Sequence, residues 1–419
     1  MNGGGRWAFL VHPHLGGTWT VFTSLRQGLA AHGLELRWVG AGSAAAAATA
    51  DPAWAHERDR GEAIHLPGAG EAALGLALAA HLERAGYAGV FVNVLACPVQ
   101  TNAVRWLPSR LRRIMLVHNV TPGTYAAAGA MRDFVHATVG VSWRIGTDLV
   151  RRHGFPAART RVIPNAVDLA RFLAAPRVPR APGGPLRLLS LGRLEEAAKG
   201  IFWLPRILAK LDGEHVHLTV AGDGPDREAL AERLAPFGGR VDFLGPVAPA
   251  EVPTLCARHD ALLAPSRFEG FGQTIVEAMA AGTVPVVSRL EGITTRIVTD
   301  GTDGFLFPVG DVAAAATALR RLARAPDLAT RMGERARRAV AGRFDLATQA
   351  EAYAALVRMV TALPEDAAHS LRGAPWSWPR GLRPGLRTLL PEPLKRHLRL
   401  WRERLATAAA GGATRHGGC

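Results

Sequence analysis

The chain has 419 residues, long enough for two domains that each bury a full hydrophobic core. Its net charge of +15 is compatible with nucleic acid, an anionic membrane surface or an anionic substrate, but no helix-turn-helix, zinc-finger or RNA-binding motif supports nucleic acid. There is no apolar run of the ~20 residues that span a membrane and no signal-peptide pattern, and Cys97, Cys256 and Cys419 are too few and scattered for disulfides or a metal cluster. We therefore expect a cytoplasmic protein from a reducing compartment.

Residues 6–170 alternate short apolar runs with helical patterns, which predicts a parallel sheet covered by helices in a first domain over residues 1–176. Ala41–Asp51 is rich in alanine and is compatible with a loop or a frayed helix. Helices are expected over Val21–His32 and Glu71–Ala85. The expected strands are Trp7–Val11, Glu35–Val39, Val90–Val94, Ile114–Val117 and Thr138–Val141.

Residues 177–185 contain three prolines and two glycines, which indicates a linker between domains. A second α/β pattern covers residues 186–345, and Val298–Gly310 reads as the last turn of its sheet. A helix over residues 346–363 follows it. The expected strands of this second domain are Leu186–Leu191, Val216–Ala221, Arg240–Leu244, Asp260–Leu263 and Val284–Val287.

Residues 364–419 form a predicted basic tail, since residues 365–419 hold 10 Lys or Arg against 4 Asp or Glu. Within it, residues 393–410 mix leucines and a tryptophan with lysine and arginine, which predicts a short basic amphipathic helix. Three interpretations stay open for this segment: peripheral contact with an anionic membrane at its inner face, docking on the rest of the protein, or disorder. The charge favours a bilayer surface or an anionic lipid-linked ligand over nucleic acid.

The most informative stretch is residues 265–282. A buried strand over Asp260–Pro265 leads into a Gly270–Gly272 turn and a helix over Gln273–Ala281, which Gly282 ends. The unpaired N–H groups and the positive dipole end of such a helix suit a phosphate. Glu269 lies in the loop and Glu277 about one turn into the helix, so the two carboxylates reach different parts of one ligand. An ordinary loop glutamate and an ordinary helix glutamate would give the same spacing.

The surrounding residues resemble the Glu-x7-Glu signature of family-4 glycosyltransferases, and further segments follow in that family's order over residues 6 to about 360. Val162–Asp168 is similar to its Pro-Asn-Gly-Val-Asp turn, although Ala166 replaces the glycine. The remaining segments are Gly16-Gly17 after the first strand, His118 at a strand end, Ser190–Leu194 with Lys199-Gly200, Ala221–Pro225, and Phe243–Val247. The resemblance implies the GT-B fold, in which two Rossmann-like domains face a cleft, with the helix at 346–363 returning to the first domain. It also implies that residues 1–176 face the acceptor and residues 186–345 bind a nucleotide-sugar.

The resemblance assigns roles to particular residues. Arg193 and Lys199 would stabilise the diphosphate leaving group, although two exposed basic residues are common in a chain with 50 of them. Glu277 would bind the ribose, and Glu269 would bind sugar hydroxyls beside the N–H groups of Gly270 and Gly272. Phe271 would shape the sugar pocket, and His118 would contact the donor sugar or its leaving side. The other donor-binding positions are Gly16, Gly17, Gly222, Val247, Gln273 and Thr274.

These assignments imply a retaining glycosyltransferase that moves a sugar from a UDP- or GDP-sugar to a hydroxyl of a lipid-linked or polysaccharide acceptor. The catalytic residues would be His118, Arg193, Lys199 and Glu269, with no cofactor. No Asp-x-Asp occurs in the sequence, so basic residues rather than a metal are expected to hold the diphosphate. Three alternatives remain open: a nucleotide-sugar epimerase of the same fold, a non-catalytic sugar-nucleotide-binding protein, and a nucleic-acid-binding protein.

Overall fold

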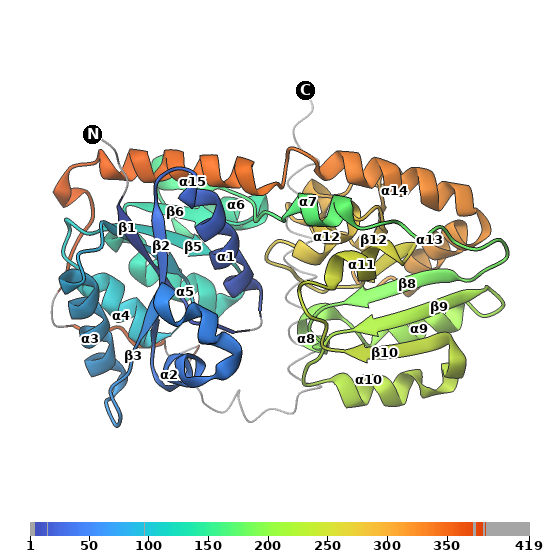
Figure 1. Cartoon of the computed structure of the whole chain (residues 1–419), viewed down its shortest axis with the longest axis horizontal. Helices are drawn as coiled ribbons and strands as arrows, with labels where there is room; N and C mark the ends of the chain where they lie inside the picture. The colour runs from blue at the N-terminus through green and yellow to red at the C-terminus, as the bar shows by residue number, and fades with distance from the viewer. Residues whose placement is uncertain (1–4, 15, 96, 372–373, 380–381, 383–419) are drawn as a thin grey trace. The chain divides into compact units, whose positions relative to one another are not determined.

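Two parallel β-sheets flanked by helices make up the described part of the chain (Figure 1). The computed structural model describes residues 5–14, 16–95, 97–371, 374–379 and 382. Residues 1–377 belong to one unit, and a second unit, residues 378–419, is described only at residues 378, 379 and 382. The basic helix predicted at residues 393–410 therefore lies outside the described residues. Among the described helices, none is both long and apolar enough to cross a bilayer.

The first sheet has seven strands in the order β3-β2-β1-β4-β5-β6-β7, and every neighbouring pair is parallel. Helices α1 and α15 pack on one face through Phe22, Leu25 and Tyr353, and α3, α4 and α5 cover the other. The strands are β1 Arg6–Leu10, β2 Glu35–Ala41, β3 Gly61–Ile64, β4 Gly89–Asn93, β5 Arg112–Val117, β6 Ala137–Gly140 and β7 Thr160–Val162. The helices are α1 Gly17–Ala30, α2 Ser43–Ala50, α3 Glu71–Arg84, α4 Pro98–Trp106, α5 Pro122–Met131, α6 Trp143–His153 and α15 Leu346–Thr361.

The second sheet has six strands in the order β10-β9-β8-β11-β12-β13, again all parallel. Its strands are β8 Leu186–Leu191, β9 Val216–Ala221, β10 Val241–Gly245, β11 Ala261–Ala264, β12 Val284–Ser288 and β13 Phe305–Phe307. Its helices are α7 Leu169–Ala174, α8 Glu196–Lys199, α9 Trp203–Lys210, α10 Arg227–Leu234, α11 Val252–Ala257, α12 Gln273–Ala280, α13 Val312–Arg324 and α14 Pro326–Val340. Short 3₁₀ helices lie at η1 Pro52–Arg60, η2 Arg132–Phe134, η3 Ala157–Arg159, η4 Ala235–Arg240, η5 Thr294–Arg296 and η6 Glu365–Ala367.

The prediction of two Rossmann-like parallel sheets is confirmed, and the strands expected from buried apolar runs are present. Three short strands, β3, β7 and β13, were not predicted as strands. All three are edge strands of three or four residues, too short for a periodic pattern. The alanine-rich segment resolves into a helix, α2.

Strand order reverses at one point in each sheet, and this places the loops that matter for function. In the first sheet, the chain moves outward from β1 to β3 and then continues from β4 on the other side of β1. In the second sheet, the corresponding reversal lies between β8 and β11. Ligands of open parallel sheets bind at the carboxyl ends of the two strands that flank such a reversal. The loops after β8 and β11 are therefore the expected binding loops of the second sheet.

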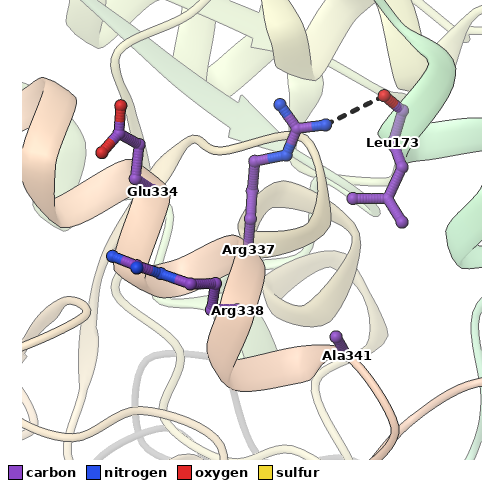
Figure 2. Close-up of a pocket in the computed structure, with 5 residues that line it drawn as sticks. All are labelled: Leu173, Glu334, Arg337, Arg338 and Ala341. Atoms are coloured by element: carbon purple, nitrogen blue, oxygen red, sulfur yellow. Dashed lines mark hydrogen bonds between the residues drawn. The ribbon is translucent and has the colours of Figure 1, made fainter.

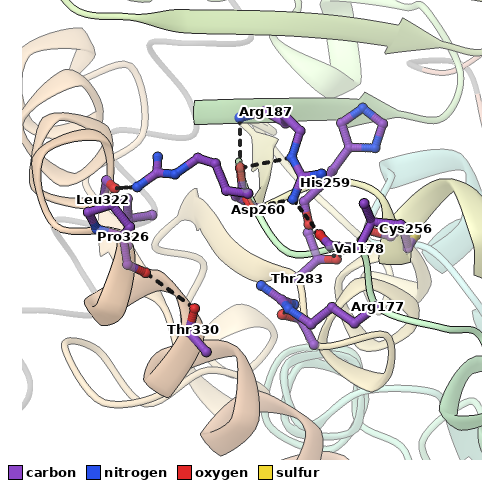
Figure 3. A network of polar contacts seen from close by, with 12 residues as sticks. Arg177, Val178, Arg187, Cys256, His259, Asp260, Thr283, Leu322, Pro326 and Thr330 are labelled. Atoms are coloured by element: carbon purple, nitrogen blue, oxygen red, sulfur yellow. Dashed lines mark hydrogen bonds and ion pairs between the residues drawn. The ribbon is translucent and has the colours of Figure 1, made fainter. Parts of the chain in front are cut away.

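Residues 177–185 form neither helix nor strand. Arginine side chains connect them to the second domain through hydrogen bonds (Figure 3). Arg177 donates a hydrogen bond to the carbonyl of Gly282, and Arg180 donates to the carbonyl of Leu322 at 3.2 Å. Arg187 of β8 binds Asp260 through two side-chain contacts, Nη2–Oδ1 at 2.8 Å and Nε–Oδ2 at 3.1 Å. The same guanidinium donates to the carbonyl of Val178 at 2.6 Å. The linker thus follows the second sheet, and α7 before it also packs on α11 and α12.

Residues 364–371 and 374–377, which the sequence assigns to the tail, pack on the first sheet. Arginine side chains hold their backbone: Arg159 donates to the carbonyl of Ala367 at 2.7 Å and Arg113 to that of His369 at 3.2 Å. Further along, Trp376 exchanges two hydrogen bonds with the side-chain amide of Asn102, at 2.6 and 3.2 Å. This segment therefore completes the first domain instead of leaving it at Pro364.

Removing Asp260 tests the importance of its ion pair with Arg187. The Asp260 side chain is 5% exposed, so Asp260→Ala would strand the guanidinium in a mostly buried site and is expected to cost about 3 kcal/mol of stability. Arg358→Ala is the matched control, because Arg358 and Glu351 form a pair in which both side chains are 60% exposed, worth about 0.5 kcal/mol or less. Urea denaturation followed by circular dichroism measures both. Equal shifts of the two midpoints would contradict the prediction.

Candidate functional site

The connection from β11 to α12 carries both glutamates of the signature, and two glycines shape it. Gly272 caps α12 with a left-handed φ of +99°, which favours glycine. A β-carbon on Gly270 would lie 1.9 Å from the carbonyl oxygen of His118, so only glycine allows this approach to the end of β5. No side chain from the described part of the chain caps the start of α12, and its first-turn N–H groups and positive dipole end are suited to an anion.

Lys199 and Glu269, predicted independently, form an ion pair. The distance from Lys199 Nζ to Glu269 Oε1 is 2.6 Å, and Ser266 Oγ donates to the same oxygen at 2.8 Å. The Glu269 side chain is 12% exposed and that of Lys199 is 31% exposed. Because Lys199 follows β8 and Glu269 follows β11, the pair lies where the strand order of the second sheet reverses.

A buried ion pair holds these two loops together, and sequence reasoning did not assign it a role. Arg267 pairs with the carboxylate of Glu196, and its guanidinium carbon lies 3.9 Å from the ring centre of Trp203. The backbone N–H of Arg267 donates to the carbonyl of Ala198 at 2.8 Å, one residue before Lys199. The side chains of Glu196 and Arg267 are 4% and 13% exposed. Arg267 lies within the signature stretch, but nothing in the sequence singles out Glu196 as its partner.

Arg193 stands apart from this arrangement. Its side chain is 68% exposed, and among the described residues its ion pair is with Glu195, at 3.6 Å. The structure does not bring it into contact with Lys199 or Glu269. It remains a solvent-facing cation at the end of β8.

His118 follows β5, and its carbonyl faces Gly270. Its Nε2 atom is buried and has no hydrogen-bond partner among the described residues. Burial lowers the pKa of His118 to about 4, so the imidazole is neutral at pH 7. A neutral ring with a buried polar atom lacking a protein partner is suited to a hydrogen bond with a neutral ligand group.

Glu277 lies in α12, where desolvation raises the pKa of its carboxyl to about 7. Gln273, at the start of the helix, donates from Nε2 to Glu277 Oε1 at 3.3 Å, which partly offsets the shift. Thr274 is partly exposed beside it. With Gln273 on one oxygen, the carboxyl keeps acceptor capacity for hydroxyl groups, as the role predicted for it requires.

The other predicted positions have structural roles of their own. Gly222 has a φ of +133°, and a β-carbon there would lie 1.9 Å from the carbonyl oxygen of Gly192, so it brings the loops after β8 and β9 together. Phe271 is 4% exposed and packs against Phe344 at 5.6 Å between ring centres, which places it in the core. Val247 is half-buried after β10.

Gly16 and Gly17 begin α1 at the end of the loop that follows β1. Gly16 is exposed and precedes the helix without a side-chain cap, and a β-carbon on Gly17 would meet nothing within 4 Å. The loop after β1 therefore leaves these backbone groups accessible at the strand-order reversal of the first sheet.

A shallow pocket elsewhere contains none of the predicted site residues (Figure 2). It is lined by Leu173 of α7 and by residues at the end of α14, where Arg337 donates to the carbonyl of Leu173 at 2.9 Å. The other lining residues are Glu334, Arg338 and Ala341. The predicted site is thus defined by its loops and their contacts, not by this pocket.

The two doubly wound domains are those of the GT-B class, as solved structures of similar fold show. Anabaena Alr3699/HepE in complex with UDP and glucose has a TM-score of 0.68 at 18% identity, over 85% of this chain and 100% of that one. A glycosyltransferase from Rickettsia africae has a TM-score of 0.70 at 16% identity, over 85% and 98%. At these identities the likeness establishes the fold alone.

Family models identify the chain more closely. The model described as Glycosyltransferase Family 4 matches residues 15–171, and the one described as Glycosyl transferases group 1 matches residues 185–325. The chain belongs to this glycosyltransferase family.

Curated relatives match over part of their length. A glycogen synthase of Mycobacterium tuberculosis is 31% identical over 258 residues, which cover 58% of this chain and 61% of the relative. A phosphatidyl-myo-inositol mannosyltransferase of Mycolicibacterium smegmatis is 36% identical over 197 residues, 46% of this chain and 50% of the relative. The chain therefore spans little more than half the length of the relatives it matches.

The raised pKa of Glu277 predicts a pH-dependent stability. Its folded pKa of about 7 exceeds the ordinary value of 4.5, so the folded protein binds the proton more tightly than the unfolded chain. Stability from this group is present below pH 4.5 and is lost as the pH rises through 7. Glu277→Gln cannot ionise and should gain, relative to wild type, about 3 kcal/mol of stability between pH 4.5 and pH 8.

Urea denaturation of both proteins across this pH range tests the prediction. Glu232→Gln, on the exposed side of α10, is the control and should follow wild type at every pH. A stability difference between Glu277→Gln and wild type that stays constant with pH would show that the carboxyl is not perturbed.

Proposed function

We propose that this protein is a retaining glycosyltransferase that moves a sugar from a UDP- or GDP-sugar to a hydroxyl of a lipid-linked or polysaccharide acceptor. The observation that carries the proposal is the Lys199–Glu269 ion pair at the strand-order reversal of the second sheet, beside the uncapped start of α12. This arrangement combines a cation and helix N–H groups for a diphosphate with a carboxylate for sugar hydroxyls.

Lys199 supplies positive charge where the leaving diphosphate becomes more negative. Catalysis requires interactions that strengthen in the transition state, and a fixed ammonium group beside a helix N-terminus provides one. In the structure, the Glu269 carboxylate holds the Lys199 ammonium group, and Ser266 Oγ donates a hydrogen bond to that carboxylate. Arg193, exposed at the end of the same strand β8, adds a second cation when the donor binds.

Glu269 and His118 contact the sugar, and Glu277 contacts the ribose. The buried Nε2 atom of His118 gains its missing partner from a sugar hydroxyl. Because Gly270 brings the loop of Glu269 against the His118 carbonyl, the two side chains start from adjoining backbone segments. Together they fix the orientation of the sugar relative to the diphosphate.

Retention is proposed through a front-side reaction. The bond from the anomeric carbon to the phosphate oxygen breaks, the bond to the acceptor oxygen forms on the same face, and the acceptor proton passes to the leaving phosphate. Glu269, which holds Lys199, has the role of binding the sugar and not of attacking it. This chain's contribution is to place the donor and to stabilise the charge of the leaving group.

The relatives support a donor and acceptors of these classes without choosing among them. The Anabaena structure of similar fold contains UDP and glucose, and the named relatives act on glycogen and on phosphatidyl-myo-inositol. A cytoplasmic protein that contacts the inner face of the membrane peripherally would meet either kind of acceptor, and this location is part of the proposal.

Lys199→Ala tests the diphosphate assignment. Loss of the ammonium group should lower kcat/KM by roughly 100- to 1000-fold, and Arg193→Ala should have a smaller effect because that side chain is mostly exposed. Lys210→Ala, at the exposed end of α9, is the control and should keep full activity. Rates are measured as release of UDP or GDP from a panel of nucleotide-sugars, with and without acceptor.

The same assay separates the proposal from its alternatives. Full activity of a variant lacking both Arg193 and Lys199 would reject the diphosphate site. Conversion of a nucleotide-sugar to its epimer with no acceptor present would identify an epimerase instead. Salt-sensitive binding of duplex DNA without any turnover would indicate a nucleic-acid-binding protein.

Metal independence is tested by chelation. If Lys199, Arg193 and the N-terminus of α12 balance the diphosphate charge, activity should change by less than about twofold in excess EDTA. Mg²⁺ and Mn²⁺ added back serve as controls. Activity that disappears with EDTA and returns with either ion would overturn this part of the proposal.

A further inference from the structure

The carboxyl ends of the first five strands of the first sheet, β1 to β5, are almost free of charge. The segments that leave β1, β2, β3, β4 and β5 contain a single Asp, Glu, Lys or Arg, which is Glu71. In the whole chain 20% of residues are charged. These segments are residues 11–24, 41–50, 64–76, 93–104 and 117–131.

The second sheet has the same architecture and the opposite composition. Its corresponding loops after β8, β9 and β11 carry charges throughout: Arg193, Glu195, Glu196, Lys199, Asp223, Asp226, Arg227, Arg267, Glu269 and Glu277. The other end of the first sheet is also charged, with Arg110, Arg112, Arg113 and Arg132. Neither the fold nor the overall composition of the domain therefore explains a neutral edge.

Exposed leucines lie on this neutral edge. Leu66 is 43% exposed, Leu76 60% and Leu95 43%, and residues 65–73 are exposed without interruption. Single exposed leucines are ordinary, but three on adjoining segments whose one charged residue is Glu71 form a mostly apolar surface. We call Leu66, Leu76, Leu95 and the exposed residues 65–73 the apolar rim.

Contacts show that these segments adjoin one another. A β-carbon on Gly42, in the segment after β2, would lie 3.8 Å from the Leu74 side chain. A β-carbon on Gly75 would lie 2.9 Å from the carbonyl oxygen of Val99, so α3 packs directly on the start of α4. The start of α3 is therefore next to the segments that follow both β2 and β4.

Strand order places one end of the apolar rim beside the proposed sugar site. Leu95 follows β4, one of the two strands that flank the reversal of strand order in the first sheet. The next strand is β5, and His118 follows its last residue; neighbouring strands are about 4.8 Å apart. A molecule whose hydroxyl lies near His118 can thus extend across Leu95 toward Leu76 and Leu66.

We infer that the apolar rim binds the aliphatic chain of a lipid-linked acceptor. The inference rests on the proposed function, and it selects a lipid-linked acceptor over a polysaccharide one. A bare glycan would need polar or aromatic side chains, whereas exposed residues 65–73 are mostly glycine, alanine, proline and leucine. The net charge of the chain favoured an anionic lipid-linked ligand. These segments contain no lysine or arginine that could pair with an anionic group, so the inference here is an uncharged aliphatic chain.

Binding of alkyl glucosides to the full-length protein tests the inference without requiring donor or turnover. Hexyl, octyl and decyl β-D-glucoside are titrated below their micelle concentrations by calorimetry. Affinity should rise roughly two- to fourfold per methylene group, since apolar area is removed from water. It should be insensitive to NaCl between about 0.05 and 0.5 M, because no ion pairs form.

The double variant Leu66→Glu/Leu76→Glu should bind decyl glucoside at least tenfold more weakly and lose the dependence on chain length. Both side chains are exposed, so the variant should keep its thermal midpoint. Leu173→Glu is the matched control: Leu173 is 44% exposed on α7, outside the apolar rim, and should bind as wild type does.

Several outcomes would overturn the inference. Chain-length dependence that survives in the double variant would place alkyl binding elsewhere, as would affinity that is independent of chain length. Sedimentation velocity showing a wild-type dimer that the double variant dissociates would make the surface an interface between two copies. Because donor binding is measured separately with UDP- and GDP-sugars, failure of the donor site and failure of the apolar rim are distinguishable.

Discussion

The ion pair between Lys199 and Glu269 joins two loops 70 residues apart in the sequence, and the architecture of the second sheet brings them together. Both loops leave the sheet where strand order reverses, so their backbones diverge and leave space at the strand ends. A buried network then fixes their separation, with Arg267 between Glu196 and Trp203. Removal of one member of so buried a pair leaves an unbalanced charge, which makes the network sensitive to substitution.

Close backbone approach is the second constraint on the site. Gly270 meets the His118 carbonyl, Gly222 meets Gly192, and a β-carbon on Gly200 would lie 2.4 Å from the carbonyl oxygen of Pro265. In each case the glycine allows two loops to pack with their backbones in contact. Several glycines that sequence reasoning assigned to ligand approach therefore have a packing role that is sufficient to explain them.

The sequence predicts the parts of the fold whose signal is local. Buried apolar runs such as Val216–Ala221 identify central strands, and the glycine turn before α12 identifies the helix start. The edge strand β13 was not predicted because its three residues are too few to show a periodic pattern of apolar side chains. The Glu196–Arg267 ion pair could not be predicted for another reason. Its two residues are 71 positions apart, and in the sequence each resembles an ordinary surface charge. Similarly, the packing of residues 364–371 depends on arginines far away in the chain, including Arg113 and Arg159.

In the proposed function, one architecture serves two kinds of ligand. Each sheet presents the carboxyl ends of parallel strands and the starts of helices, and therefore the same backbone dipoles. The second sheet adds charged side chains, which balance and orient an ionic ligand. The segments after β1 to β5 of the first sheet add only Glu71, so their helix starts and exposed leucines offer few of the ion pairs that an ionic group would require. Since backbone geometry is shared, side-chain charge is what separates the two sides, and on that basis our proposals assign the ionic substrate to the second sheet and the apolar one to the first.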